Sequence, residues 1–146
     1  MEKLHFTASI NAPKTKVWEV LWGDETYGQW TRPFAEGSAA ITDWKEGSRV
    51  LFTAGNGDGM VSMIEKKVDN SFMSFKHIGM IKDGKEDTES DAVNSFAGAH
   101  ENYKLEEKDG VTMLNVEMDT VEDYKKYFQD TWPLAIDKLK ALAENS

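Results

Sequence analysis

Residues 120–144 read TVEDYKKYFQDTWPLAIDKLKALAE, and no other segment says as much about the fold. The apolar residues recur at every third or fourth position, as on one face of an α-helix: Val121, Tyr124, Phe128, Trp132, Ala135, Leu139 and Leu142. Thr120 with Asp123 three residues later resembles the capping box of a helix start. At about 1.5 Å per residue the helix would be about 35 Å long, enough to cross a domain. Pro133 should kink it, because proline has no backbone N–H.

The N-terminal segment predicts a strand and two short helices. Residues 4–10 alternate between apolar and polar side chains, which is typical of a half-buried strand. Pro13 suits the first position of a helix, and Gly23 suits a left-handed turn at its end. A second short helix is expected over residues 24–30, because Arg32-Pro33 disfavours its continuation.

Residues 37–118 predict a run of strands at hairpin distance. Turn signals such as Glu46-Gly47, Asp69-Asn70 and Asp109-Gly110 separate most of them. The expected strands are residues 38–42, 49–53, 60–68, 71–81, 100–107 and 111–118. Neighbours this close in sequence pair antiparallel, because parallel neighbours need long crossovers. These patterns therefore predict an α+β fold with an antiparallel seven-stranded sheet and a long C-terminal helix.

One connection does not fit the hairpin pattern. Residues 82–98 are polar and acidic and end in Phe96-Ala97-Gly98. A connection of this length tends to be mobile or functional, and a solvated hairpin loop is the simpler interpretation.

Composition excludes several classes of function. The 146 residues fit one domain, 1–146. Cysteine is absent, which excludes disulfides, thiolate metal sites and cysteine nucleophiles. The net charge of −9 argues against nucleic acid and anionic membrane surfaces as partners. The sequence has neither a signal-like N-terminal stretch nor an apolar run of spanning length, so membrane insertion is not expected and the expected location is the cytoplasm.

The candidate motifs for metal or cofactor binding lack the required context. The glycine-rich run at residues 55–59 leads into a strand, whereas a phosphate loop leads into a helix. The acidic run at residues 83–91 lacks the spacing of a calcium loop. The three histidines show no metal-ligand spacing, and no G-x-S-x-G motif is present. We therefore expect no metal, no cofactor and no assignable catalytic residue.

Two expected strands carry polar groups among apolar neighbours. By alternation, Met73, Phe75, His77 and Ile81 share one face of the first strand, and Glu101, Tyr103 and Leu105 share one face of the second. If both faces meet the C-terminal helix, His77 and Glu101 become polar anchors on an apolar wall. In the alternative interpretation they face solvent or form a structural pair.

Several segments together resemble a known superfamily over essentially the whole chain. They are FTASINAPKTKVWEVLWGDETYGQW, TRPFAEGS, DWKEGSRV, SFKHIGMIKDG, GAHENYKLEEKDGVTMLNVE and YFQDTWPLAIDKLKALAE. They resemble the SRPBCC (START-like, helix-grip) superfamily, in the branch related to the activator of heat-shock-protein ATPase. The resemblance implies a helix-grip fold, in which the curved seven-stranded sheet wraps around the long C-terminal helix. It also implies a cavity between sheet and helix that holds apolar molecules in many members.

Three functions follow as hypotheses. The first is a cytoplasmic binding protein for a small apolar or amphipathic ligand. Its expected contact residues are Phe52, Phe75, His77, Glu101, Tyr103, Phe128, Trp132 and Ile136. The second is a stress-related or chaperone-associated module that binds a protein partner. The third is a cyclase- or hydrolase-like enzyme that uses His77 or Glu101 as acid or base.

Overall fold

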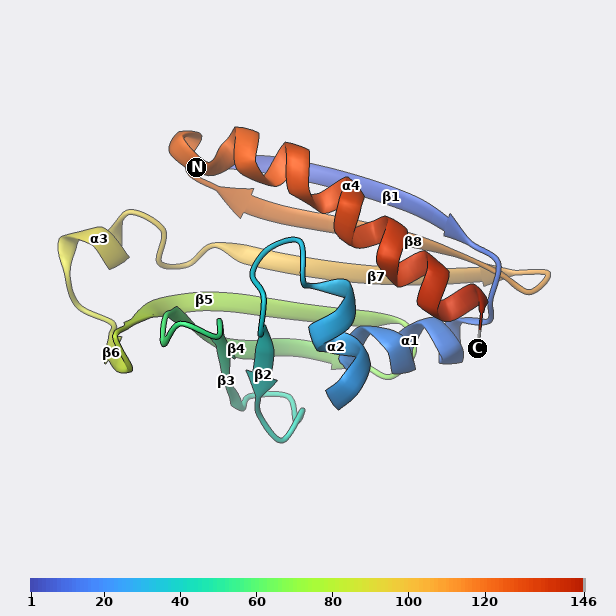
Figure 1. The fold of residues 1–146 in the computed structure, drawn as a ribbon, viewed down its shortest axis with the longest axis horizontal. Coiled ribbons are helices and arrows are strands. Elements are labelled where there is room, and N and C mark those ends of the chain that lie inside the picture. Colours follow the sequence, from blue (N-terminus) through green and yellow to red (C-terminus); the bar gives the residue numbers. More distant parts are fainter. Residues whose placement is uncertain (146) are drawn as a thin grey trace.

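The structure is a computed structural model that describes residues 1–145. It is an α+β fold in which one antiparallel sheet curves around a long C-terminal helix (Figure 1). The elements in chain order are β1 (Glu2–Ile10), α1 (Lys14–Trp22), α2 (Asp24–Trp30), β2 (Ala39–Ile41), β3 (Arg49–Thr53), β4 (Gly59–Val68), β5 (Phe72–Lys82), β6 (Lys85–Asp87), α3 (Asp91–Asn94), β7 (His100–Lys108), β8 (Val111–Thr120) and α4 (Glu122–Glu144). The predicted fold class is confirmed.

Over residues 1–145 the sheet has eight strands, and the prediction of seven was wrong by one. Seven strands follow the order β1-β8-β7-β5-β4-β3-β2, and the additional strand β6 pairs with β5. Asp83 and Gly84 both have positive φ and form the tight turn between β5 and β6. Gly79 allows the close approach, because a Cβ there would lie 2.5 Å from the Asp87 carbonyl oxygen. The connection expected to be irregular therefore begins as a short hairpin.

The rest of this connection, residues 88–99, forms the α3 projection at one end of the sheet (Figure 1). Ser90 caps the short helix α3 by accepting a hydrogen bond from the Val93 N–H. The Val93 side chain is fully buried, so the segment has an apolar anchor that the sequence interpretation did not identify. The projection is thus partly packed against the fold.

The helix boundaries differ in detail from the expectations. Pro13 occupies the N-cap of α1, one residue before the first helical position. Gly23 has φ −68 and joins α1 to α2 in an extended conformation, so the left-handed turn expected there is wrong. Thr120 ends β8 instead of capping α4, whose N-cap is Val121 without a side-chain hydrogen bond. The strand ends two residues beyond the expected residue 118, because Thr120 still pairs with Glu2 of β1.

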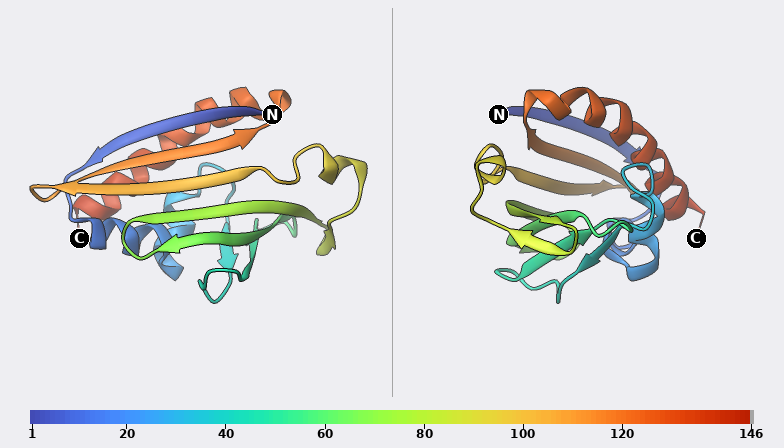
Figure 2. Two further views of the ribbon diagram at one scale, coloured as in Figure 1. Left: turned by 180° about the vertical axis from the view of Figure 1, so that it is seen from behind. Right: turned by 60° about the vertical axis from the view of Figure 1, so that its left-hand side comes forward.

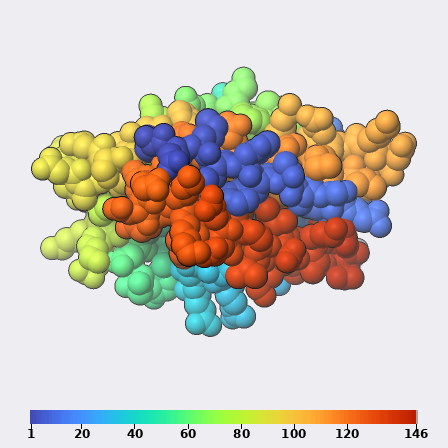
Figure 3. Space-filling model, turned by 90° about the horizontal axis from the view of Figure 1, so that it is seen from above, coloured from blue at the N-terminus to red at the C-terminus, as the bar shows by residue number. Residues whose placement is uncertain are grey.

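Helix α4 is continuous through Pro133 and crosses the concave side of the sheet beside β1 (Figure 2). Seen from above, β1 and α4 lie next to each other at the surface (Figure 3). The buried residues of α4 all lie at or after Thr131: Thr131, Trp132, Ala135, Ile136, Leu139 and Ala143. The second half of the helix therefore covers the main apolar core. Within residues 1–145, none of the helices is sufficiently long and apolar to cross a bilayer.

Two irregularities in the β4–β5 pairing determine which side chains face inward. Val61 pairs with Gly79 but Ser62 pairs with His77, so Ile78 is an extra residue in β5. A second shift leaves Glu65 as an extra residue in β4. Each extra residue reverses, in the rest of its own strand, which side chains face inward and which face outward. The expectation that Ile81 shares a face with His77 is therefore wrong, and Met80 takes the inward position.

Candidate functional site: a cavity under the first half of α4

A cavity of about 680 Å³ lies between the sheet and the first half of α4. Helix α2, the α3 projection and strands β2 to β5, β7 and β8 also contribute to its wall. The wall is rich in aromatic side chains: Tyr27, Trp30, Phe34, Phe52, Phe96, Tyr103, Tyr124, Tyr127, Phe128 and Trp132. A volume of a few hundred cubic ångströms with an aromatic lining suits a small organic molecule.

Trp132 and Trp30 close the inner end of the cavity. Both are almost fully buried, and their ring centroids lie 6.0 Å apart. The Trp30 indole N–H donates to the Leu21 carbonyl at 3.1 Å, and the Trp132 indole N–H contacts the Met118 sulfur at 3.0 Å. These hydrogen bonds fix the two rings in orientation, so this end of the wall is rigid.

Tyr124, Tyr127 and Phe128 form the outer end on the first turns of α4. Tyr124 is 59% exposed and Tyr127 is 42% exposed, so these rings stand at the rim. The Tyr127 hydroxyl donates to the Phe34 carbonyl at 2.8 Å, which links the helix to the segment after α2. The α3 projection faces them through Ala92, Ser95 and Phe96. The rim is thus assembled from segments far apart in sequence.

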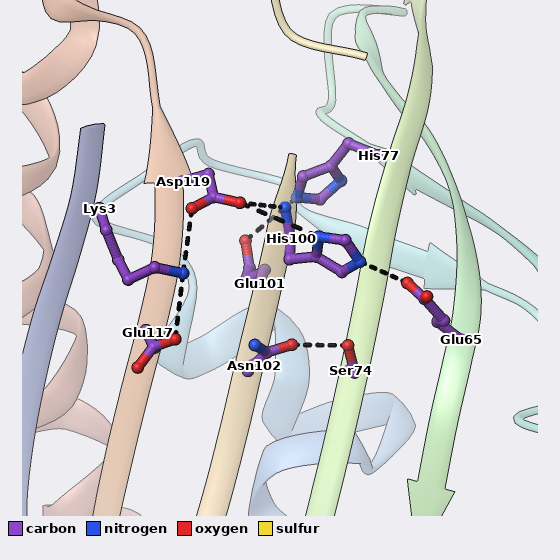
Figure 4. A network of polar contacts seen from close by, with 9 residues as sticks. All are labelled: Lys3, Glu65, Ser74, His77, His100, Glu101, Asn102, Glu117 and Asp119. Carbon is purple, nitrogen blue, oxygen red and sulfur yellow. Dashed lines mark hydrogen bonds and ion pairs between the residues drawn. The ribbon is translucent and has the colours of Figure 1, made fainter. Parts of the chain in front are cut away.

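Glu101 is the centre of a polar group within this aromatic wall. The Tyr103 hydroxyl donates to Glu101 Oε2 at 2.5 Å, because alternation on β7 puts residues 101 and 103 on one face. His77 Nε2 lies 3.5 Å from Glu101 Oε1 (Figure 4). The two side chains of this pair are only 11% and 20% exposed. A carboxylate that is largely removed from water therefore faces the cavity.

His77 is held in turn by Ser62, whose Oγ lies 2.6 Å from His77 Nδ1. In a neutral ring, a hydroxyl that donates to Nδ1 leaves the proton on Nε2, the atom that faces Glu101. Ser62 is fully buried and does not line the cavity. It orients the histidine and is not placed to act on a ligand. The sequence analysis missed Ser62 because the bulge at Ile78 brings it opposite His77.

The tyrosine hydroxyls near Glu101 are held in the protonated form. Burial, followed by the negative charge of Glu101, raises the pKa of Tyr103 well above its usual value. The same two causes raise the pKa of Tyr27. Both hydroxyls therefore remain hydrogen-bond donors over the whole physiological pH range. Beside them, Glu101 and His77 together could orient a polar group of a ligand or transfer a proton.

Asp119 touches the cavity rim but belongs mainly to a network on the outer face of the sheet (Figure 4). It lies 3.2 Å from Lys3 Nζ and accepts the His100 backbone N–H at 3.0 Å. Burial opposes ionisation, but these hydrogen bonds outweigh it and lower the pKa of Asp119. His100 also contacts Glu65 across the same outer face. Most of the charge of Asp119 is therefore compensated by its partners.

The structure places most of the predicted contact residues on the cavity wall: Phe52, His77, Glu101, Tyr103, Phe128 and Trp132. Phe75 and Ile136 do not line it. Phe75 is fully buried behind Phe52 and Tyr103, with ring centroids 5.1 and 6.1 Å away. Ile136 lies one turn beyond Trp132, in the packed half of α4. Ligand contact by the remaining six stays a prediction.

Sequence reasoning did not identify several wall residues. Tyr27 and Phe34 come from α2 and the segment after it, Met60 and Met80 face each other across β4 and β5, and Phe96 comes from the α3 projection. Aromatic content in residues 24–34 was the available signal. Alternation alone could not identify Met80, because the bulge reverses it.

The model of the family described as "Activator of Hsp90 ATPase homolog 1-like protein" matches residues 11–144. The chain belongs to this family. The match covers both the sheet and α4, and the family is part of the SRPBCC superfamily, as the resemblance implied. No curated protein matches the chain in sequence.

Solved structures agree with this family fold over nearly the entire chain. The solution structure of the Aha1 dimer from Colwellia psychrerythraea has a TM-score of 0.75 at 17% identity, covering 99% of this chain and 97% of that one. A protein from Mesorhizobium loti has a TM-score of 0.76 at 16% identity, covering 99% and 98%. A protein from Cytophaga hutchinsonii has a TM-score of 0.72 at 21% identity, covering 99% and 95%. At these identities the likeness shows the fold alone.

Proposed function

We propose that this chain is a binding protein for a small apolar or amphipathic molecule, held in the cavity between the sheet and the first half of α4. The observation that carries the proposal is the aromatic cavity of about 680 Å³ with Glu101 and His77 as polar groups in its wall. Cavities of this size and lining are typical of small-molecule sites. The cytoplasm is part of the proposal, and the absence of cysteine fits a reducing compartment.

The residues of the cavity wall indicate two roles, contact with the apolar part of the ligand and orientation of its polar group. Phe52, Phe128 and Trp132 would contact the apolar body of the ligand, because burying an aromatic or aliphatic surface releases water from both partners. Glu101 and His77 would hold one polar group and set its orientation. The half-exposed rim at Tyr124 and Tyr127 would be the entrance.

The test uses the neutral, apolar dye Nile red and the full chain. We expect saturable binding to one site with increased fluorescence. Phe128→Ala should weaken it about tenfold, because a ring in contact with the ligand contributes about 1.5–3 kcal/mol when fully buried and Phe128 is only partly covered. Leu142→Ala is the matched control: it truncates another partly buried residue of α4 that does not line the cavity.

Two results would contradict this function. One is no saturable binding of the dye by the folded protein. The other is an equal loss in Phe128→Ala and Leu142→Ala, which would mean that the dye reports helix loosening and not cavity occupancy. Native mass spectrometry of the protein from its own source adds an independent readout, a co-purifying small molecule.

The family description supports a second candidate, a chaperone-associated module that binds a protein partner. Leu134 on α4 is 58% exposed and is not among the buried residues of the helix, so its side chain is accessible to a protein partner. The test is the ATPase rate of an Hsp90-type chaperone with and without the chain. Stimulation by the native protein that Leu134→Ser removes would support this candidate, and an unchanged rate would contradict it.

A further inference from the structure

The charges around the cavity have one predominant sign. Within the described residues 1–145, the ionisable groups on its wall, other than tyrosine, are Glu101, Asp119, Asp123 and His77. Among these described residues, no Lys or Arg lines the cavity. A carboxylate-bearing ligand would find no fixed cation there, although fixed cations are what proteins usually place against carboxylates.

Glu101 is the acid whose charge matters most inside. It is 20% exposed, and its nearest ion-pairing partner is His77, which carries a charge only when protonated. Asp119 is different because Lys3 lies 3.2 Å from it on the outer face. Glu101 Oε2 accepts a hydrogen bond from Tyr103, Oε1 lies 3.5 Å from His77 Nε2, and each carboxylate oxygen has two acceptor positions. Glu101 can therefore accept a further donor from a ligand.

The rings next to Glu101 favour the same ligand charge. The Tyr103 hydroxyl touches the carboxylate, and Trp30 and Trp132 pack around Tyr103 with centroids 6.5 and 6.0 Å away. Aromatic faces carry negative potential and attract cations, most strongly when water is excluded. The Glu101 carboxylate and the aromatic rings around it therefore favour a ligand that carries an ammonium group on an apolar body.

We propose that the cavity selects an amphipathic amine, with the ammonium group on Glu101 and the apolar body against Trp132 and Phe128. This inference rests on the proposed function and names the ligand class. It also predicts that carboxylates bind weakly. An anionic group would be repelled by Glu101, and it would lose its hydration water without meeting a Lys or Arg side chain in the cavity.

The net charge of −9 would also attract amines to the protein surface. The test must therefore separate binding at Glu101 from this general attraction. A diffuse surface charge attracts every cation weakly and is screened by salt, whereas a largely buried carboxylate is screened much less. Glu106 provides the matched control on the same strand. It faces outward, is exposed and pairs with Lys104 at 3.0 Å. Glu106→Gln therefore removes the same charge without touching the cavity.

The experiment is calorimetric titration of the full chain at neutral pH in about 0.15 M salt. The probes share one ring system: naphthylmethylamine, naphthylmethanol and naphthoate. We expect the amine to bind at least about tenfold tighter than the alcohol, as a charge-assisted hydrogen bond would allow, and naphthoate to bind more weakly than either. Glu101→Gln should remove the difference between amine and alcohol, and Glu106→Gln should preserve it.

The proposal is overturned if naphthoate binds as tightly as the amine in the native protein. It is also overturned if the amine's advantage survives Glu101→Gln, or if Glu106→Gln removes it equally. Should Glu101→Gln fail to fold, the three probes are ranked on the native protein at about 0.15 M and about 1 M salt, and an amine advantage that disappears at high salt overturns the proposal. Alcohol binding without any advantage for the amine would refute the ligand class and leave the binding function standing. Failure of all three probes and of Nile red would refute both.

Discussion

The two halves of α4 cover two different interiors. From Thr131 onward the helix buries six side chains against the sheet and α1, whereas before Thr131 no helix residue is fully buried. The first half spans the cavity and presents Tyr124 and Tyr127 at its rim. One amphipathic stripe thus serves a packed core at one end and an open pocket at the other. The difference shows that apolar periodicity identifies a covered face but does not say whether protein or ligand covers it.

The largest expected contrast comes from removing the packed half. A chain that stops after Thr131 loses Trp132, Ala135, Ile136, Leu139 and Ala143 from the core. Each large apolar side chain contributes about 1.5–3 kcal/mol of burial, and the combined loss reaches the whole stability margin of a domain. We expect no cooperative thermal transition by circular dichroism. A truncated chain that melts near the full-length temperature would contradict the packing of α4.

Single substitutions should show that side chains in the two halves of α4 contribute differently to the free energy of unfolding. Leu139 is fully buried, so Leu139→Ala should cost about 2–5 kcal/mol in the free energy of unfolding. Tyr124→Ala, on the rim, should change it by less than about 0.5 kcal/mol. Urea denaturation of both variants gives the comparison. Equal losses would mean that the first half of α4 is as tightly packed as the second.

Alkaline pH should destabilise the fold through Tyr27 of α2 and Tyr103 of β7, two tyrosines of the cavity wall. The folded pKa values of Tyr27 and Tyr103 are raised above the unfolded value of about 10. Stability is therefore complete below about pH 10 and is lost above it, because only the unfolded chain then releases the tyrosine protons. Each tyrosine should add about 1.4 kcal/mol of loss per pH unit.

Urea unfolding between neutral pH and about pH 11 measures this slope. Replacing both tyrosines by phenylalanine should reduce it, whatever the stability at neutral pH. Lys3 and Lys125 also have raised pKa values through their carboxylate partners and contribute in the same direction, but they are present in both proteins. Equal slopes in the two proteins would refute the assignment to tyrosine.

The smallest expected effect is local opening of the α3 projection. The sequence predicts fast hydrogen exchange for residues 83–91, which are polar and acidic. The structure sharpens this prediction, because the β6 pairing and the buried Val93 hold the two ends of the segment. Amides of residues 88–91 should exchange fastest, and His77, whose N–H donates to Ala99, should exchange slowly. Uniformly slow exchange across residues 83–99 would mean that the rim is closed without a ligand.

The sequence by itself determined the elements whose signal is local. The helical stripe of α4, the strand alternation in β1 and the hairpin turns depend on residues close in the chain, and all of them are present. The placement of Glu101 beside Tyr103 belongs to this group, because alternation within one strand suffices. The Asp83-Gly84 turn that leads into β6 is also a local feature, because it depends on two adjacent residues with positive φ.

The tertiary structure alone decided how the cavity is closed and which groups meet inside it. The β-bulges that pair Ser62 with His77 and turn Met80 inward arise from register between two strands, and neither strand contains that information alone. Phe75 and Ile136 share their faces with wall residues, yet they are buried by neighbours from other elements. Val93 anchors a charged segment because the fold leaves an apolar site for it. Burial is a property of the assembled surface, and for that reason periodicity predicted the faces but not their partners.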